Sequence, residues 1–138
     1  HGRSILAAQA CGADLAYIGS AFIATAEANA DQGYKEGIVA GRAGDIVYSN
    51  LFTGVHGNYL RQSIIAAGMD PDNLPEGDLK TMNFGSGGNT KAKAWKDIWG
   101  SGQGIGSISG VRPAGDFIAE LAEQYRSAYR ELQAKYIA

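Results

Sequence analysis

The sequence contains few of the residues that stabilise small secreted proteins or bind metals. Its 138 residues include three prolines, two histidines (His1 and His56) and one cysteine, Cys11. One thiol cannot form an internal disulfide and fits a reducing compartment, so we expect a cytoplasmic protein. The histidines lie far apart in sequence, and the carboxylates near His56 do not have ligand spacing. We therefore predict no metal site.

The chain also lacks an excess of positive charge and any long apolar run. Its 12 basic and 14 acidic residues give a net charge of -2, with a pI near 5.6. Nucleic acids and anionic membranes require a basic surface, so we expect neither as a partner. Apolar stretches such as Ile5–Cys11 are too short to span a bilayer, and no signal peptide is evident. The start at His1, close to a structural element, suggests that a preceding part of a larger protein is missing.

Glycine, by contrast, is abundant. The chain has 20 glycines, about twice the usual share. They are dispersed rather than concentrated in a linker, which indicates tight turns or backbone that approaches a ligand closely. The 45% hydrophobic and 19% charged content is that of a soluble globular protein.

The order of local patterns indicates an α/β protein. The Ala-rich segment Ser4–Cys11 predicts a helix ended by Gly12, and the apolar segment Asp14–Ile18 predicts a buried strand that ends at Gly19. A helix, a tight turn and an apolar strand in this order are typical of parallel α/β folds. Cys11 is expected in the core.

The rest of the chain is predicted to be mainly helical. Helices are expected over 29–40 or 31–40, 58–67, 90–99 and, as the strongest element, from Pro113 to about Tyr136. A strand is expected over 45–48, a turn over 70–75, and loops over 84–89 and 100–110. Trp95 and Trp99 lie one helical turn apart and are expected to pack, while His56 is expected in a solvated loop.

The Gly19-Ser20 pair is the most informative local feature. It follows an apolar strand and precedes helix-prone sequence. Backbone N–H groups and a hydroxyl directed outward at such a place form an anion site, although an ordinary strand-to-helix turn has the same pattern. The other Gly-rich segments, 102–107 and 85–91, do not match the dinucleotide or phosphate-loop spacings. No Ser/His/Asp or Cys/His set with motif context is present.

Residues 12–25 (GADLAYIGSAFIAT) resemble the corresponding stretch of the nitronate monooxygenase family, formerly called 2-nitropropane dioxygenases. The resemblance continues at 52–55 (FTGV), 58–61 (NYLR), 94–99 (AWKDIW) and 101–104 (SGQG), and so covers nearly the whole chain.

This resemblance implies the C-terminal portion of a TIM (β/α)8 barrel that binds FMN, incomplete on its own. Residues 1–28 would hold the seventh barrel helix, the eighth strand and the phosphate loop, and residues 29–138 a mainly helical region. The FMN-binding residues implied are Tyr17, Ile18, Gly19 and Ser20, with Gln103 as a further candidate. A whole barrel needs about 250 residues, so the family's catalytic residues lie upstream of His1 and none is assigned here.

The implied reaction is the oxidation of alkyl nitronates by O2 to a carbonyl compound and nitrite. Two related alternatives stay open, an FMN-dependent enoyl-acyl carrier protein reductase and an NAD(P)H:quinone reductase. A third, of another class, is a non-catalytic helical interaction fragment. The expected partner is the N-terminal part of the barrel, on the same or a separate chain, because an eighth strand with an open edge pairs readily with other strands. A homo-oligomer also stays open.

Overall fold

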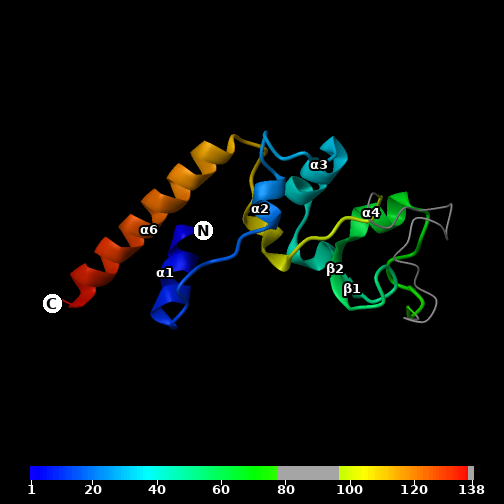
Figure 1. Cartoon of the computed structure of the whole chain (residues 1–138), viewed down its shortest axis with the longest axis horizontal. Coiled ribbons are helices and arrows are strands. Elements are labelled where there is room, and N and C mark those ends of the chain that lie inside the picture. The colour runs from blue at the N-terminus through cyan, green and yellow to red at the C-terminus, as the bar shows by residue number, and fades with distance from the viewer. Residues whose placement is uncertain (78–96, 137–138) are drawn as a thin grey trace.

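The computed structural model describes residues 1–77 and 97–136, an elongated arrangement of helices around one short β-hairpin (Figure 1). The elements in chain order are α1 (Gly2–Ala10), α2 (Ser20–Ile23), α3 (Gln32–Ala40), η1 (Ala43–Asp45), β1 (Ile46–Ser49), β2 (Gly57–Leu60), α4 (Arg61–Ala66), η2 (Gln103–Ser107) and α6 (Ala114–Tyr136). Helices α1 and α6 form one end of the molecule, and the hairpin and α4 lie towards the other (Figure 1).

The strand predicted over Asp14–Ile18 is not formed among the described residues, where this segment pairs with no other strand. It connects α1 to α2, with Leu15 and Tyr17 89% and 101% exposed. A β-strand is defined by its ladder hydrogen bonds, and this segment has no neighbour to form them. The expected position of Cys11 is wrong: Cys11 is exposed and caps the C-terminus of α1.

Several local signals at helix ends are confirmed. Gly12 follows α1 with φ 98°, the left-handed conformation that favours glycine. Of the two starts expected for the helix that ends at residue 40, the later one is confirmed, because Asp31 caps α3 and its side chain accepts a hydrogen bond from Gly33 N at 2.8 Å. The turn over 70–75 contains a hydrogen bond from Asp72 N to Asp70 Oδ1 at 3.0 Å. Each feature depends only on neighbouring residues.

The hairpin corrects the helix predicted over 58–67. Residues 57–60 form β2, which pairs antiparallel with β1 in the register Ile46↔Leu60 to Ser49↔Gly57, and the helix begins only at Arg61. The strand predicted over 45–48 is confirmed as β1, shifted by one residue. Asn58, the first residue of the predicted helix, lies in a strand because its neighbours Tyr59 and Leu60 are buried in the core.

Two small clusters of buried residues lie away from the contact between α1 and α6. One contains the buried residues Ala24, Ile38, Leu60 and Ile105, and joins α2, α3, β2 and η2. The other contains Tyr59, Ile64 and Ile98. The segment 97–108 contributes to both clusters, so it is held by the core rather than free.

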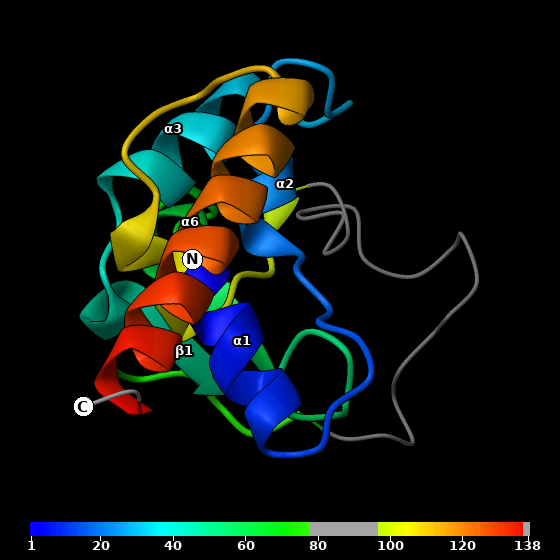
Figure 2. The ribbon, with the colours of Figure 1, turned by 90° about the vertical axis from the view of Figure 1, so that its left-hand side faces the viewer.

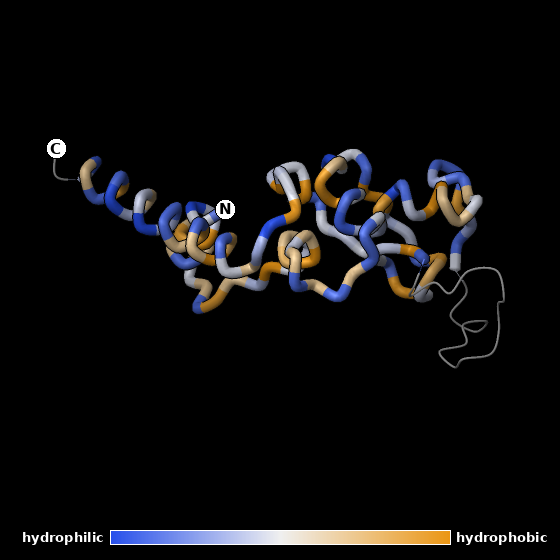
Figure 3. Tube along the Cα trace, turned by 90° about the horizontal axis from the view of Figure 1, so that it is seen from above, coloured by the Kyte–Doolittle hydropathy of each residue, from blue (hydrophilic) through white to orange (hydrophobic). Residues whose placement is uncertain are grey.

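Helix α6 is long, amphipathic and packed mainly on α1, beside which it lies in Figure 2. Of the apolar and aromatic residues along α6, Phe117, Leu121 and Ala128 are buried, whereas Ile118, Tyr129 and Leu132 are exposed. The alternation of hydrophilic and hydrophobic positions along this helix is visible in Figure 3. Helix α6 begins at Ala114, directly after Pro113. No helix in the described ranges is long and apolar enough to cross a membrane.

The two helices approach most closely at Gly2. A Cβ atom added there would lie 2.2 Å from the backbone oxygen of Leu121 and 2.4 Å from the backbone nitrogen of Tyr125. Real Cβ atoms do not come so close to backbone atoms, so any other residue at this position would separate α1 from α6. Gly2 N also donates to Gln124 Oε1 at 2.8 Å, which fixes the crossing point.

The substitution Gly2→Ala should lower the free energy of unfolding by about 1–3 kcal/mol, the usual cost of overpacking. Gly115→Ala is a matched control, because Gly115 lies in the first turn of α6 with no atom near its Cβ position. Alanine there should be neutral or stabilising by up to about 1 kcal/mol. Urea unfolding of both variants measures the difference. Equal stabilities would contradict the close packing at Gly2.

Candidate functional site

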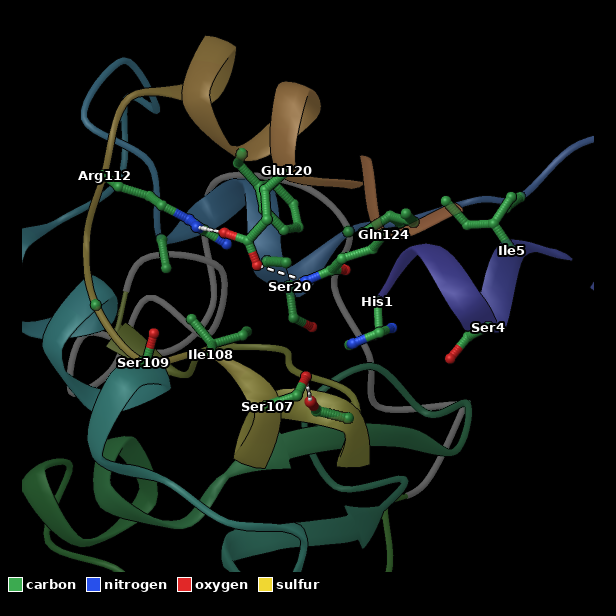
Figure 4. Close-up of a pocket in the computed structure, with 18 of the residues that line it drawn as sticks. His1, Ser4, Ile5, Ser20, Ser107, Ile108, Ser109, Arg112, Glu120 and Gln124 are labelled. Atoms are coloured by element: carbon green, nitrogen blue, oxygen red, sulfur yellow. Dashed lines mark hydrogen bonds and ion pairs between the residues drawn. The ribbon is translucent and has the colours of Figure 1, made fainter. Parts of the chain in front are cut away.

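A cavity of about 500 Å³ lies between α1, the segment 16–21, the segment 104–112 and the first turns of α6. Figure 4 shows His1 and Ser4 on one side of it, Ser107, Ile108 and Ser109 below, and Arg112, Glu120 and Gln124 above. Its size is within the range of small-molecule sites, about 300–1,000 Å³.

Four of the five predicted site residues line this one cavity. They are Tyr17, Ile18, Gly19 and Ser20. Gln103 is not among the lining residues, and its side chain instead donates to Asn58 Oδ1 at 3.1 Å. The Gly-rich segment still reaches the cavity through its neighbours, because Gly104 and Ser107 line it.

The Gly19-Ser20 turn presents hydrogen-bond donors at the start of α2. Gly19 is the N-cap residue, and Phe22 N donates to its carbonyl oxygen at 2.9 Å. Within the described part of the chain, the N–H groups of Ser20 and Ala21 have no acceptor. Ser20 Oγ accepts from Gly102 N at 3.0 Å, so its own proton is available to a ligand. The turn therefore offers an anion several donors at once.

The start of α1 faces the same cavity. His1 caps the helix, its Nδ1 accepting from Arg3 N at 3.2 Å, and both His1 and Ser4 line the cavity. The partial positive charge at a helix N-terminus favours an anion nearby. The cavity thus lies between the first residues of two helices, with hydroxyl groups of Ser4, Ser20, Ser107 and Ser109 around it.

Three charged or polar residues of the cavity were not predicted from the sequence. Arg112 forms an ion pair with Glu120, and Gln124 Nε2 donates to Glu120 Oε1 at 2.6 Å (Figure 4). The signal was present, because Glu120 and Gln124 are four residues apart and Phe117 precedes Gln124 by seven, which places them on one side of α6. Arg112 lies outside the helix, so its participation depends on the tertiary fold.

A second, smaller cavity of about 250 Å³ is lined by aromatic residues of the hairpin region. Trp99 stacks on Tyr34 with ring centroids 5.1 Å apart, and Phe52 meets Tyr59 edge-on at 4.8 Å. The packing expected of Trp99 is confirmed, whereas Trp95 and the loop over 84–89 lie outside the described residues. Tyr34 donates from its hydroxyl to the carbonyl oxygen of Gly100, and burial raises the pKa of this phenol.

His56 is in an exposed loop, as predicted, and stacks on Tyr48 with centroids 4.7 Å apart. It lines neither cavity. The structure therefore does not bring the two histidines together at one site.

No protein-family model matches the chain. The chain is similar to a curated protein, nitronate monooxygenase from Paraburkholderia phytofirmans, with 26% identity over 137 residues. The match covers 96% of this chain and 37% of that relative. The resemblance to the nitronate monooxygenase family is thereby confirmed, and the chain spans just over a third of the relative's length.

Solved structures of FabK from Thermotoga maritima have a similar fold. A mutant form matches with a TM-score of 0.66 and 20% identity, over 97% of this chain and 41% of FabK. A second FabK structure matches with a TM-score of 0.65 and 19% identity, over 97% of this chain and 44% of FabK. The chain therefore has the fold of part of FabK.

The half-buried phenol of Tyr34 should make the fold sensitive to alkali. Because its pKa is raised in the folded state, Tyr34 contributes stability below its unfolded pKa of about 10, and this is lost as the pH rises further. Near neutral pH, Tyr34→Phe should have a lower free energy of unfolding than wild type, since the hydrogen bond to Gly100 is lost. As the pH rises above about 10, the free energy of unfolding of Tyr34→Phe should fall less than that of wild type. Thermal unfolding against pH measures this, with Tyr48→Phe at an exposed ring as control. An unchanged alkaline slope would contradict the prediction.

Proposed function

We propose that the cavity holds the phosphate group of FMN and that the protein forms part of an FMN-dependent nitronate monooxygenase. The observation on which this rests is the convergence of the starts of α1 and α2 on one cavity. A phosphate monoester carries close to two negative charges near neutral pH and binds several donors. The N–H groups and hydroxyls around the cavity match that requirement.

The donors fit a phosphate in kind as well as number. The N–H groups of Ser20 and Ala21, and the hydroxyls of Ser20 and Ser109, would hold its oxygens. Gly19 has no atom within 4 Å of its Cβ position, so open space adjoins the turn where the phosphate would bind. Tyr17 and Ile18 would support the turn from the preceding segment. Gln103, bonded to Asn58, would contribute only by holding in place the segment whose Gly104 and Ser107 line the cavity.

The substrates proposed are an alkyl nitronate and O2. When bound, FMN supplies the redox chemistry that converts them into a carbonyl compound and nitrite. The described residues contribute binding and orientation of the phosphate end, and no catalytic residue is assigned among them. The relative from Paraburkholderia phytofirmans, named nitronate monooxygenase, supports this substrate class.

The unpaired segment supports the proposal that residues 1–28 complete a barrel. Asp14–Ile18 is open to pairing on both edges within the described structure, and Leu15 and Tyr17 are left exposed although both side chains are large and apolar or aromatic. An apolar run of this kind is typical of a strand whose two faces are covered once its neighbours are present. We propose that the neighbours are the preceding strands of the barrel, and that 29–138 is the added, mainly helical region.

Flavin titration of the purified protein tests the function. Wild type should quench FMN fluorescence, and Ser20→Ala should weaken FMN binding about tenfold or more, as expected for a hydrogen bond to a charged group. Ser127→Ala is the control, because Ser127 lies on α6 with its hydroxyl bonded to Glu131, outside the cavity. Wild-type protein that binds no FMN would refute the proposal and leave the non-catalytic alternative.

Turnover assays separate the enzymatic alternatives. With FMN bound, nitronate-dependent O2 consumption and nitrite release without NADH are expected. Turnover that requires NADH or NADPH, with an enoyl thioester or a quinone as acceptor, would favour the reductase alternatives instead. The similarity of fold to FabK is the reason to run both assays on the same preparation.

A further inference from the structure

We infer that Arg112 is the cationic ligand of the phosphate group in this cavity and that the Glu120 carboxylate competes with the phosphate for it. This inference rests on the proposed function and adds the residue that would distinguish a phosphorylated flavin from an unphosphorylated one. Arg112 and Glu120 both line the cavity and form an ion pair within it (Figure 4).

Backbone contacts hold Arg112 in position. Its carbonyl oxygen accepts a hydrogen bond from Ala26 N at 3.0 Å, and Arg112 forms a parallel bridge with Thr25, only five residues after Ser20. The next helix is held by the same segment, since Ala114 N donates to Glu27 Oε2 at 2.9 Å. The guanidinium group therefore starts from a backbone that is tied to Thr25 and Ala26, the residues that follow α2.

The guanidinium group lies at the cavity wall with donors to spare. Its central carbon lies 4.7 Å from the ring centroid of Phe117, a lining residue. Arginine has five N–H donors, and only Nη1 is bonded to the Glu120 carboxylate in the described structure. The planar group can donate two parallel bonds to a phosphate, which is why arginine is common at phosphate sites.

The ion pair with Glu120 is open to exchange. The two side chains are 36% and 44% exposed, so solvent screens their attraction. Glu120 would not be left without a partner, because Gln124 donates to its other oxygen and Gln124 is held in turn by Gly2 N. A phosphate with nearly two charges should displace a single carboxylate from Arg112. Without phosphate, the pair keeps the cavity close to neutral.

The test compares phosphate binding in variants that keep size but change charge. Arg112→Met should weaken FMN binding about tenfold or more, since charge-assisted bonds are lost, while riboflavin binding changes little. Glu120→Gln should tighten FMN binding about threefold or more, because the competing charge is gone but an oxygen that can hold the guanidinium group stays. The ratio of FMN to riboflavin affinity is the readout.

Two variants of α6 control for net charge. Arg126 and Glu123 form an ion pair at 3.2 Å outside the cavity. Arg126→Met and Glu123→Gln change the net charge by the same amounts as the test variants, and should leave the affinity ratio unchanged. If Arg112→Met behaves like Arg126→Met, or if Glu120→Gln weakens FMN binding, the inference is overturned.

Inorganic phosphate separates this inference from the proposed function. It should raise the melting temperature of wild type and of the Arg126→Met variant, but not of Arg112→Met. If phosphate stabilises wild type through Arg112 and FMN does not bind, the inference stands and the flavin function fails. If FMN binds and Arg112→Met has no effect with either ligand, the function stands and the inference fails. A protein that binds neither phosphate nor FMN refutes both.

Discussion

The contact between α1 and α6 at Gly2 is the constraint on which the site depends. Only a residue without a side chain lets the start of α1 approach the backbone of Leu121 and Tyr125. That approach places His1 and Ser4 opposite Gln124 and Glu120 across one cavity. A second contact, from Gly102 N to Ser20 Oγ, ties the Gly-rich segment to the turn. The cavity is therefore formed by segments far apart in sequence, which small residues such as Gly2 and Gly102 allow to come close together.

Local features of the fold were predictable because their causes are local. The cap at Asp31, the left-handed Gly12, strand β1 and the long helix from Pro113 each follow from residues within one or two turns. The start of the helix expected at 58–67 was predicted too early, because Tyr59 and Leu60 are buried in two core clusters. Tertiary contacts of this kind do not show in local helix propensity. The burial predicted for Cys11 is wrong because no other element covers the C-terminal end of α1, and the thiol there stays exposed.

The part of the candidate site that consists of backbone N–H groups at a turn could be predicted from the sequence. Gly19 and Ser20 stand out because glycine and a hydroxyl after an apolar segment can present backbone N–H groups to an anion, although an ordinary turn has the same pattern. Gln103, chosen for its place in a motif, is one residue away from the lining residue Gly104 and points to Asn58. Arg112 and Glu120 could not be paired from sequence alone, since eight residues and a helix start separate them. Charge partners of this kind are set by tertiary packing, not by spacing.

The exposed segment Asp14–Ile18 links the fold to the proposed enzyme. Burying a side chain such as Leu15 is worth about 1.5–3 kcal/mol, and an unpaired extended backbone leaves its donors and acceptors to water. Burial of Leu15 and hydrogen bonding of the unpaired backbone both favour the pairing of further strands with this segment. Such pairing would stabilise the turn that follows it. A phosphate on Gly19-Ser20 would act on the same segment from its other end. Ligand binding and barrel completion should therefore reinforce one another, because each orders the few residues between α1 and α2 that the other requires.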